Sequence, residues 1–181
     1  MTKGRTIIWL MAVVMLAAAV AAQQSRKTTT AEFGAEQVEW DWTTNVFELV
    51  GGCWLNIKAN HDARMTARAM TVKADKNLQQ VEMLTAAGPV KFEVLTAKDK
   101  DGLQRKIVAS CSQKATYEEK TQVVELIGNA EADVTALPAG NVEAAHLTGD
   151  KVTVNLKANK VTVTKAHVSV TTEIDTEKGE Q

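Results

Sequence analysis

The sequence contains few aromatic residues and only two prolines, and its charges nearly cancel. Aromatic residues make up 4% of the chain, and the formal net charge is −1 at pH 7. This balance suggests neither a nucleic-acid patch nor a polybasic membrane face, so no nucleic-acid partner is expected. Because prolines are rare and no long polar tract follows residue 35, most of the chain is expected to be ordered.

No stretch after Ala22 keeps a helical period of apolar residues beyond about two turns. Valine and threonine are plentiful instead, and short segments alternate apolar with polar residues between turn residues. This alternation is typical of strands that bury one face. The sequence therefore predicts an all-β fold, with a sandwich, a jelly roll or a wound sheet as the alternatives.

The residue patterns of common catalytic and metal sites are missing. The three histidines are scattered without an HxxxH spacing, and no CxxC pair, glycine-rich phosphate loop or nucleophile elbow occurs. His146 and His167 alternate with inward residues, so both are expected to be solvated. Glu48 and Glu125 lie opposite leucines on their strands, which favours a solvated face over a pair of catalytic acids. We therefore expect no enzyme, no metal and no cofactor.

The sequence contains two cysteines, Cys53 and Cys111. A disulfide between them would close a long loop and contribute roughly 4 kcal/mol to stability. The alternative is two small buried thiols, since each cysteine lies in an alternating segment. The sequence does not decide between these two interpretations.

Residues 1–22 have the layout of a secretory signal peptide. Lys3 and Arg5 precede an uninterrupted apolar run over 7–20, and small residues follow it. The run is short for a membrane span, which needs roughly 20 residues. We expect cleavage near Ala22 and export to the periplasm, with retention as an N-terminal anchor as the alternative. Residues 23–32 are predicted to be a flexible leader, and 173–181 a disordered tail.

An internal repeat organises the rest of the chain. The segment 121–134, TQVVELIGNAEADV, matches the segment 44–57, TNVFELVGGCWLNI, without a gap. The identical pairs are Thr44/Thr121, Val46/Val123, Glu48/Glu125, Leu49/Leu126 and Gly51/Gly128. Each copy alternates, reaches glycine and alternates again, which predicts a strand, a sharp corner and a second strand.

A second matching stretch follows each copy. The segment 65–72 matches 147–154, while the turn 73–76 matches 157–160 with a spacing two residues longer. Both alignments point the same side chains inward. The domain is predicted to cover 33–172, with repeats over about 33–94 and 110–172. Asp101-Gly102 predicts a hairpin in the linker 95–109 between them.

Three features of the chain resemble the OstA-like (organic solvent tolerance-like) family of β-jelly-roll proteins in lipopolysaccharide transport. They are the Leu126–Ala130 element LIGNA, the aromatic strand starts VEWD and ATY before each copy, and the 86–92 closure AAGPVKF. The resemblance covers roughly 33–172 and is closest to the family's small periplasmic bridge members. The first copy has Gly52-Cys53 in place of Gly-Asn-Ala, so the match is looser there.

The resemblance implies a wound antiparallel jelly roll, folded like a V and built from two OstA-like repeats. It further implies an apolar interior that shelters the acyl chains of lipopolysaccharide or a related outer-membrane glycolipid. The terminal strands would pair with another copy or with OstA-like partners, so the chain would bridge the inner and outer membranes. The alternatives are an inner-membrane-anchored partner of the bridge, and a structural module that polymerises without lipid.

Residues on the inward side of the predicted strands form the candidate lipid-binding slot. They are Trp40, Phe47, Leu49, Leu55, Ile57, Met70, Val72, Met83, Phe92, Tyr117, Val124, Leu126, Val134, Val152, Val154 and Val163. The residues themselves favour an ordinary dry core, and the slot is what the resemblance adds. Trp54 is predicted to face outward, as a contact surface for a partner strand or for lipid.

Overall fold

The computed structural model describes residues 30–58, 61–98, 102–137 and 143–172. They form one sheet of antiparallel strands, so the prediction of an all-β fold is confirmed. The strands are β1 (Thr30–Gly34), β2 (Gln37–Asp41), β3 (Val46–Lys58), β4 (Asp62–Ala74), β5 (Val81–Ala87), β6 (Val90–Leu95), β7 (Gln104–Cys111), β8 (Lys114–Glu118), β9 (Val123–Leu137), β10 (Glu143–Asn155), β11 (Lys160–Thr164) and β12 (His167–Thr172). Within this described part, no helix is long and apolar enough to cross a membrane. The predicted signal peptide 1–22 and tail 173–181 lie outside the described residues.

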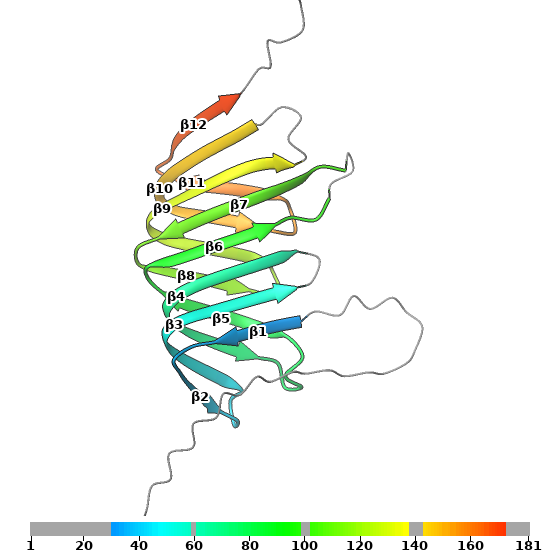
Figure 1. The fold of residues 1–181 in the computed structure, drawn as a ribbon, viewed down its shortest axis with the longest axis vertical. Helices are drawn as coiled ribbons and strands as arrows, with labels where there is room; N and C mark the ends of the chain where they lie inside the picture. Colours follow the sequence, from blue (N-terminus) through cyan, green and yellow to red (C-terminus); the bar gives the residue numbers. More distant parts are fainter. Residues whose placement is uncertain (1–29, 59–60, 99–101, 138–142, 173–181) are drawn as a thin grey trace, which may run out of the picture.

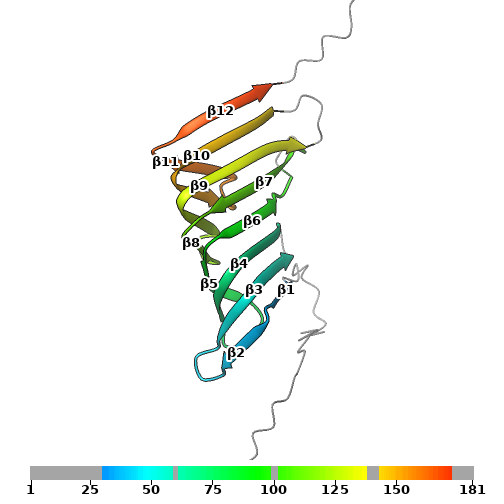
Figure 2. The ribbon, with the colours of Figure 1, turned by 60° about the vertical axis from the view of Figure 1, so that its left-hand side comes forward.

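The sheet is folded into two walls because the long strands β3, β4, β9 and β10 each belong to both. Wall A contains β1, the second half of β3, the first half of β4, β6, β7, the second half of β9, the first half of β10 and β12. Wall B contains β2, β5, β8, β11 and the other halves of the four long strands. The strands are stacked from β1 and β2 at one end to β11 and β12 at the other (Figure 1, Figure 2).

Glycines in the left-handed region produce the bends between the walls. Gly51 has a φ of 82° and Gly128 a φ of 90°, a conformation that side chains strongly disfavour. A Cβ at Gly51 would lie 2.5 Å from Oε2 of Glu36, and one at Gly128 would lie 2.4 Å from Cγ of Gln113. The pairing register also shifts at both bends. The predicted sequence of strand, corner and strand is therefore present in both copies.

The strands form two repeats, β1 to β6 and β7 to β12, with the same pattern of pairing. In each repeat the third strand pairs with the first, second and fourth, and the fourth pairs with the fifth and sixth. Met65 and Leu147 pair with matching positions of β3 and β9, so the alignment of 65–72 with 147–154 holds. Two pairings join the repeats, β5 with β8 and β6 with β7, and we call them the internal junction.

Two predicted boundaries differ from the structure. The leader predicted over 23–32 already includes the start of β1 at Thr30, because Ala31 and Phe33 alternate onto the core while β1 pairs with β3. The linker predicted over 95–109 also contains most of β7. β6 and β7 do form a hairpin, so the linker itself is short and its second half is the first strand of the second repeat.

The core lies between the walls and is tightest in the middle of the stack. Leu84 of β5, Leu126 of β9 and Val152 of β10 are all 0% exposed. Exposure rises toward both ends, where Val38 of β2 is 48% exposed and Val170 of β12 is 64% exposed. The inward apolar rows thus continue to both ends of the molecule, although nothing in the described chain covers them there.

Candidate functional site

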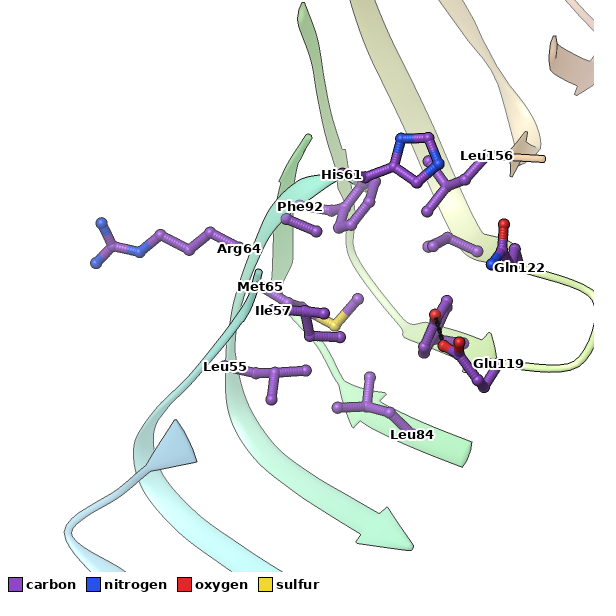
Figure 3. Close-up of a pocket in the computed structure, with 13 residues that line it drawn as sticks. Leu55, Ile57, His61, Arg64, Met65, Leu84, Phe92, Glu119, Gln122 and Leu156 are labelled. Carbon is purple, nitrogen blue, oxygen red and sulfur yellow. Dashed lines mark hydrogen bonds between the residues drawn. The ribbon is translucent and has the colours of Figure 1, made fainter. Parts of the chain in front are cut away.

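A pocket of about 80 Å³ lies between the two walls at the internal junction (Figure 3). Its apolar lining comes from strands of both walls, and its polar residues come from the chain segments at its rim. The lining residues are Leu55, Ile57, His61, Ala63, Arg64, Met65, Leu84, Phe92, Tyr117, Glu119, Gln122, Val124 and Leu156. The walls bend into each other on the side of Gly51 and Gly128, which we call the spine. The opposite side, marked by His61 and the turn 119–122, is the mouth.

Hydrogen bonds hold the polar rim of the pocket in place. Nδ1 of His61 accepts the backbone N–H of Ala97 at 3.1 Å, which ties it to the end of β6. On the other wall, the backbone N–H of Gln122 donates to the backbone carbonyl of Glu119 at 3.2 Å. The backbone N–H of Leu156 donates to the backbone carbonyl of Gln122 at 2.9 Å. Hydrogen bonds therefore hold His61 on one wall, and Gln122 and Leu156 on the other.

Tyr117 connects the apolar pocket to this rim. It is 8% exposed, and its hydroxyl donates a hydrogen bond to a carboxylate oxygen of Glu119. Burial, together with the adjacent Glu119 carboxylate, raises the pKa of Tyr117 far above its ordinary value. The phenol is therefore a neutral donor. The arrangement suits a ligand with an apolar part and a polar end, because apolar burial contributes about 0.8 kcal/mol per CH₂.

The predicted slot residues divide between the pocket and the closed core. Those that line the pocket are Leu55, Ile57, Phe92, Tyr117 and Val124. Those that lie in the packed core, at most 2% exposed, are Leu49, Met70, Val72, Leu126, Val152 and Val154. Phe47, Val134 and Val163 are partly buried against this core. The middle of the molecule is thus a packed core, with a small pocket beside it.

Met83 was predicted to face inward, and this prediction is wrong. Met83 is 50% exposed, whereas the next residue, Leu84, is completely buried. The register of β4 with β5 shifts at Lys73 and Ala74, so Val81 and Met83 do not share a face. A β-bulge of this kind adds one residue to one strand and reverses the facing of those that follow.

Trp40 lies on the predicted inward side but is 45% exposed. It pairs with Phe47 across β2 and β3, and their rings stack with centroids 5.5 Å apart and an interplanar angle of 7°. β2 is the last strand of wall B in the described sheet, so no further strand covers the indole. Alternation predicts which side of a strand a residue occupies, and the neighbouring strand determines whether that side is covered.

Cys53 and Cys111 are both buried free thiols, so the structure contains no disulfide between them. Cys53 lies on β3 and pairs with Ala67 of β4, while Cys111 lies on β7 and pairs with Val90 of β6. Since β4 and β6 stand between them, the cysteines are three strand spacings apart, about 14 Å. A disulfide needs Cα atoms within about 7 Å.

Sequence reasoning missed several pocket residues: His61, Ala63, Arg64, Met65, Leu84, Glu119, Gln122 and Leu156. Met65 opens an alternating segment, so its periodicity was a usable signal. The rim residues belong to turns, and alternation does not indicate which turns meet across a mouth. Arg64 points away from the pocket (Figure 3).

Trp54 faces outward, as predicted, but it has an intramolecular contact. A Cβ on Gly34 would lie 2.9 Å from Cζ2 of the indole, so the ring lies directly over Gly34 of β1. Trp54 remains 37% exposed. Its ring therefore helps to hold β1, an edge strand of wall A, in place beside β3.

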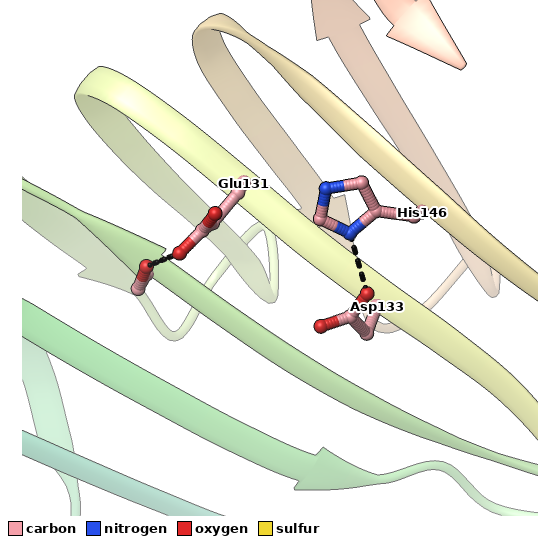
Figure 4. A network of polar contacts seen from close by, with 4 residues as sticks. Glu131, Asp133 and His146 are labelled. Carbon is pink, nitrogen blue, oxygen red and sulfur yellow. Dashed lines mark hydrogen bonds and ion pairs between the residues drawn. The ribbon is translucent and has the colours of Figure 1, made fainter. Parts of the chain in front are cut away.

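Two polar cross-strand contacts lie on the outer face of wall A (Figure 4). Nδ1 of His146 lies 2.6 Å from Oδ1 of Asp133, and the hydroxyl of Ser110 donates to Glu131 at 2.7 Å. His146 is exposed, as predicted. Exposed pairs of this kind contribute little to stability, about 0 to 1 kcal/mol. Among the described residues, no group of three or more His, Cys, Asp or Glu side chains is arranged to hold a metal.

Comparison with solved structures supports the architecture. The chain is similar to LptH from Pseudomonas aeruginosa, described as the LptA homologous periplasmic component of the conserved lipopolysaccharide transport device. The TM-score is 0.56 and the sequence identity 21%, over 81% of this chain and 95% of that one. At this identity the likeness establishes the fold, which is the LptA-like β-jelly roll. A search of curated proteins gave no match.

A family model supplies the assignment that the fold alone does not. Residues 57–160, more than half of the chain, match the model described as LptA/(LptD N-terminal domain) LPS transport protein. The matched region begins in the second half of β3, ends at the first residue of β11 and includes the whole internal junction. The chain therefore belongs to the LptA/(LptD N-terminal domain) family of lipopolysaccharide transport proteins.

Proposed function

We propose that this protein carries lipopolysaccharide, or a related outer-membrane glycolipid, across the periplasm, with the acyl chains held between its two walls. The observation that carries the proposal is the apolar inner face, which runs through the whole stack and continues beyond the closed core. At the β2 end, Trp40 is 45% exposed, and at the β12 end, Val168 is 51% exposed. A lipid tail moving along the molecule would thus meet apolar side chains from one end to the other.

The walls must separate at the mouth for a whole acyl chain to enter, because the pocket of about 80 Å³ accommodates only part of one. The connectivity suits such a movement. In the described sheet, each strand pairing lies within a wall, and the walls are joined through the bent strands and short turns of the spine. Each CH₂ buried would repay about 0.8 kcal/mol of the cost of opening.

The outermost strands supply the means of bridging. β1, β2, β11 and β12 each pair with a single neighbour in the described sheet, so one edge of each is open to another strand. Strand addition at these edges, by another copy or by an OstA-like partner, would join the interiors of neighbouring molecules. This role needs no catalysis and no cofactor, so we propose a carrier and not an enzyme.

Photo-crosslinking in living cells tests the carrier function. A crosslinker at Leu55 or Phe92, both in the pocket, is expected to capture lipopolysaccharide. The matched control is Asn56, the next residue of β3, whose side chain points to the other face. Capture of protein alone from every inward position would overturn the carrier and favour a structural module that polymerises without lipid.

Whether the N-terminal segment is cleaved distinguishes a periplasmic bridge from an inner-membrane-anchored partner. We expect residues 1–22 to be removed on export, which leaves a soluble periplasmic chain. N-terminal sequencing of the exported protein measures this directly. A mature chain that starts near Gln23 supports the bridge, whereas a retained segment supports an inner-membrane anchor.

A further inference from the structure

The two open edges of wall B carry opposite charges. Around β2, the segment 36–41 contains Glu36, Glu39 and Asp41 and no basic residue. Around β11, the segment 157–165 contains Lys157, Lys160 and Lys165 and no acidic residue. All six side chains are exposed. These charges lie at opposite ends of the stack, so they cannot neutralise each other within one molecule (Figure 1).

The internal junction shows how one repeat receives the next. In wall B, Leu84 of β5 pairs with Tyr117 of β8, and Met83 pairs with Glu118. When the two repeats are aligned, β11 of the second repeat corresponds to β5 of the first. In the same way, β2 of the first repeat corresponds to β8 of the second. The same register can therefore be transferred to a contact between the β11 edge of one chain and the β2 edge of another.

The transferred register matches both charge and apolarity in wall B. Lys160 of one chain falls opposite Asp41 of the other, in the places of Met83 and Glu118. Val161 falls opposite Trp40, in the places of Leu84 and Tyr117. Opposite charges and apolar side chains directly across two strands each stabilise the pairing.

Wall A gives a compatible result. Phe92 pairs with Ala109 at the internal junction, and the matching residues at the open edges are Val168 of β12 and Phe33 of β1. At the internal junction the phenylalanine ring lies on β6, whereas in the contact between chains it would lie on β1. Each pair thus combines one phenylalanine with one smaller apolar residue. Both residues belong to the inward row, so this contact would also extend the apolar interior.

The spine differs between the internal junction and the open edges. The backbone N–H of Gly88 donates to Gln113 at 2.6 Å, and a Cβ at Gly88 would lie 2.2 Å from the carbonyl oxygen of Ser112. In the second repeat, Lys165 stands where the first has Gly88 and Pro89. Because a side chain prevents so close a backbone approach, a contact between chains needs a different link at this point.

Lys165 has a suitable partner at the other end of the molecule. Glu36 occupies in the first repeat the place of Gln113, since both lie against the glycine of a bend. Lys165 already pairs with Asp150 at 2.6 Å, and both side chains are mostly exposed, so its ammonium group retains free donors. A lysine at one spine end and a glutamate at the other can replace the backbone contact with an ionic one.

We propose that the acidic β2 edge is specific for the basic β11 edge of a second copy of this chain, with Lys160 facing Asp41 and Lys165 facing Glu36. The inference rests on the proposed assembly through edge strands and specifies its partner, direction and register. Two β2 edges, or two β11 edges, would place like charges together, so only the head-to-tail arrangement is favoured. Asp41 remains able to accept from Lys160, although its oxygens already accept from Thr43 and Thr44 at 2.8 Å.

Charge reversal tests this register in solution. Asp41→Lys alone and Lys160→Asp alone are each expected to weaken self-association roughly tenfold in sedimentation experiments. The double variant, Asp41→Lys with Lys160→Asp, is expected to recover self-association, since its own edges match again. It should not join wild-type chains, because each mixed junction places like charges together. The control is Lys120→Asp, in the exposed turn between β8 and β9. It makes the same charge change as Lys160→Asp but lies away from both edges, so it should not alter self-association.

Salt provides a second readout. Raising the ionic strength from 0.1 M to 1 M shortens the Debye length from about 10 Å to about 3 Å, so wild-type association should weaken. If the wild type associates but neither salt nor the reversals alter it, the charge register is wrong and edge assembly stands. If the wild type does not associate at any concentration, both this register and assembly with a second copy are wrong, and the proposed edge pairing could involve only an OstA-like partner. Circular dichroism of each variant establishes that it is folded.

Discussion

The internal junction and the β2 edge are the same structural position in two environments. Tyr117 and Trp40 occupy matching places on β8 and β2, and each pairs with an inward residue of the next long strand. Tyr117 is 8% exposed and Trp40 is 45% exposed. The difference comes from β5, which covers β8, whereas the described chain has no strand beyond β2. In this fold, burial is therefore determined by the neighbouring strand rather than by the residue.

The side chains at the two places also differ in size. The ring of Trp40 stacks on Phe47 with centroids 5.5 Å apart and meets Trp42 edge to face at 6.4 Å. Phe33 in turn meets Phe47 edge to face, with centroids 5.0 Å apart. The matching residues of the second repeat are Tyr117, Val124, Glu119 and Ala109. Large rings are thus concentrated where the structure ends, although the chain is poor in aromatics. The parts of these rings that remain exposed can be buried on assembly, so the edge is suited to a partner.

Truncating the two matching aromatics is the strongest test of this comparison. Tyr117→Ala is expected to reduce the free energy of unfolding by about 4 kcal/mol, because it removes a large buried ring beside the pocket and leaves a larger cavity at the internal junction. Trp40→Ala is expected to cost the single chain about 1 kcal/mol, since its ring is half exposed, but to weaken self-association strongly. Urea denaturation measures the first effect and sedimentation the second. Equal losses of stability from both variants would contradict the comparison.

Substitution of the spine glycines is expected to reduce the free energy of unfolding by a smaller amount. Gly88→Ala places a methyl group 2.2 Å from the carbonyl oxygen of Ser112, so it is expected to destabilise the junction by about 2 kcal/mol. Gly52→Ala is the control at the bend nearest the open end. No atom lies within 4 Å of its added Cβ, and only its φ of 56° disfavours alanine, by about 1 kcal/mol. Thermal unfolding of both variants compares them, and a larger loss at Gly52 would show that the spine contact is not tight.

The sequence was informative wherever the signal was local. Alternation and the repeated glycines predicted strands, corners and the two repeats, because side-chain facing and left-handed backbone depend on a few adjacent residues. The V shape and the role in lipopolysaccharide transport came from the resemblance. The residues alone left a sandwich, a jelly roll and a wound sheet open.

The remaining features depend on contacts that are distant in sequence. The bulge that exposes Met83 and buries Leu84 arises from the pairing of β4 with β5, which alternation does not contain. The separation of Cys53 from Cys111 requires the order of the strands in wall A. The pocket rim requires knowing that His61 and Gln122 belong to turns that meet across the mouth.

The ionisation of Tyr117 is expected to have the smallest effect on stability. It also reports directly on how well the internal junction excludes water. Tyr117 is the only tyrosine in the chain, so phenolate absorbance measures this one group. Burial raises the pKa of Tyr117 above its unfolded value of about 10. The neutral phenol is thus favoured by folding, and its contribution is complete below about pH 10 and decreases as the pH rises toward the folded-state pKa. Tyr117→Phe should remove this pH dependence and, because the hydrogen bond to Glu119 is lost, about 1 kcal/mol of stability at neutral pH. Absorbance titration alongside urea denaturation measures both, and phenolate that appears near pH 10 in folded protein would mean that the junction admits water as freely as the β2 edge.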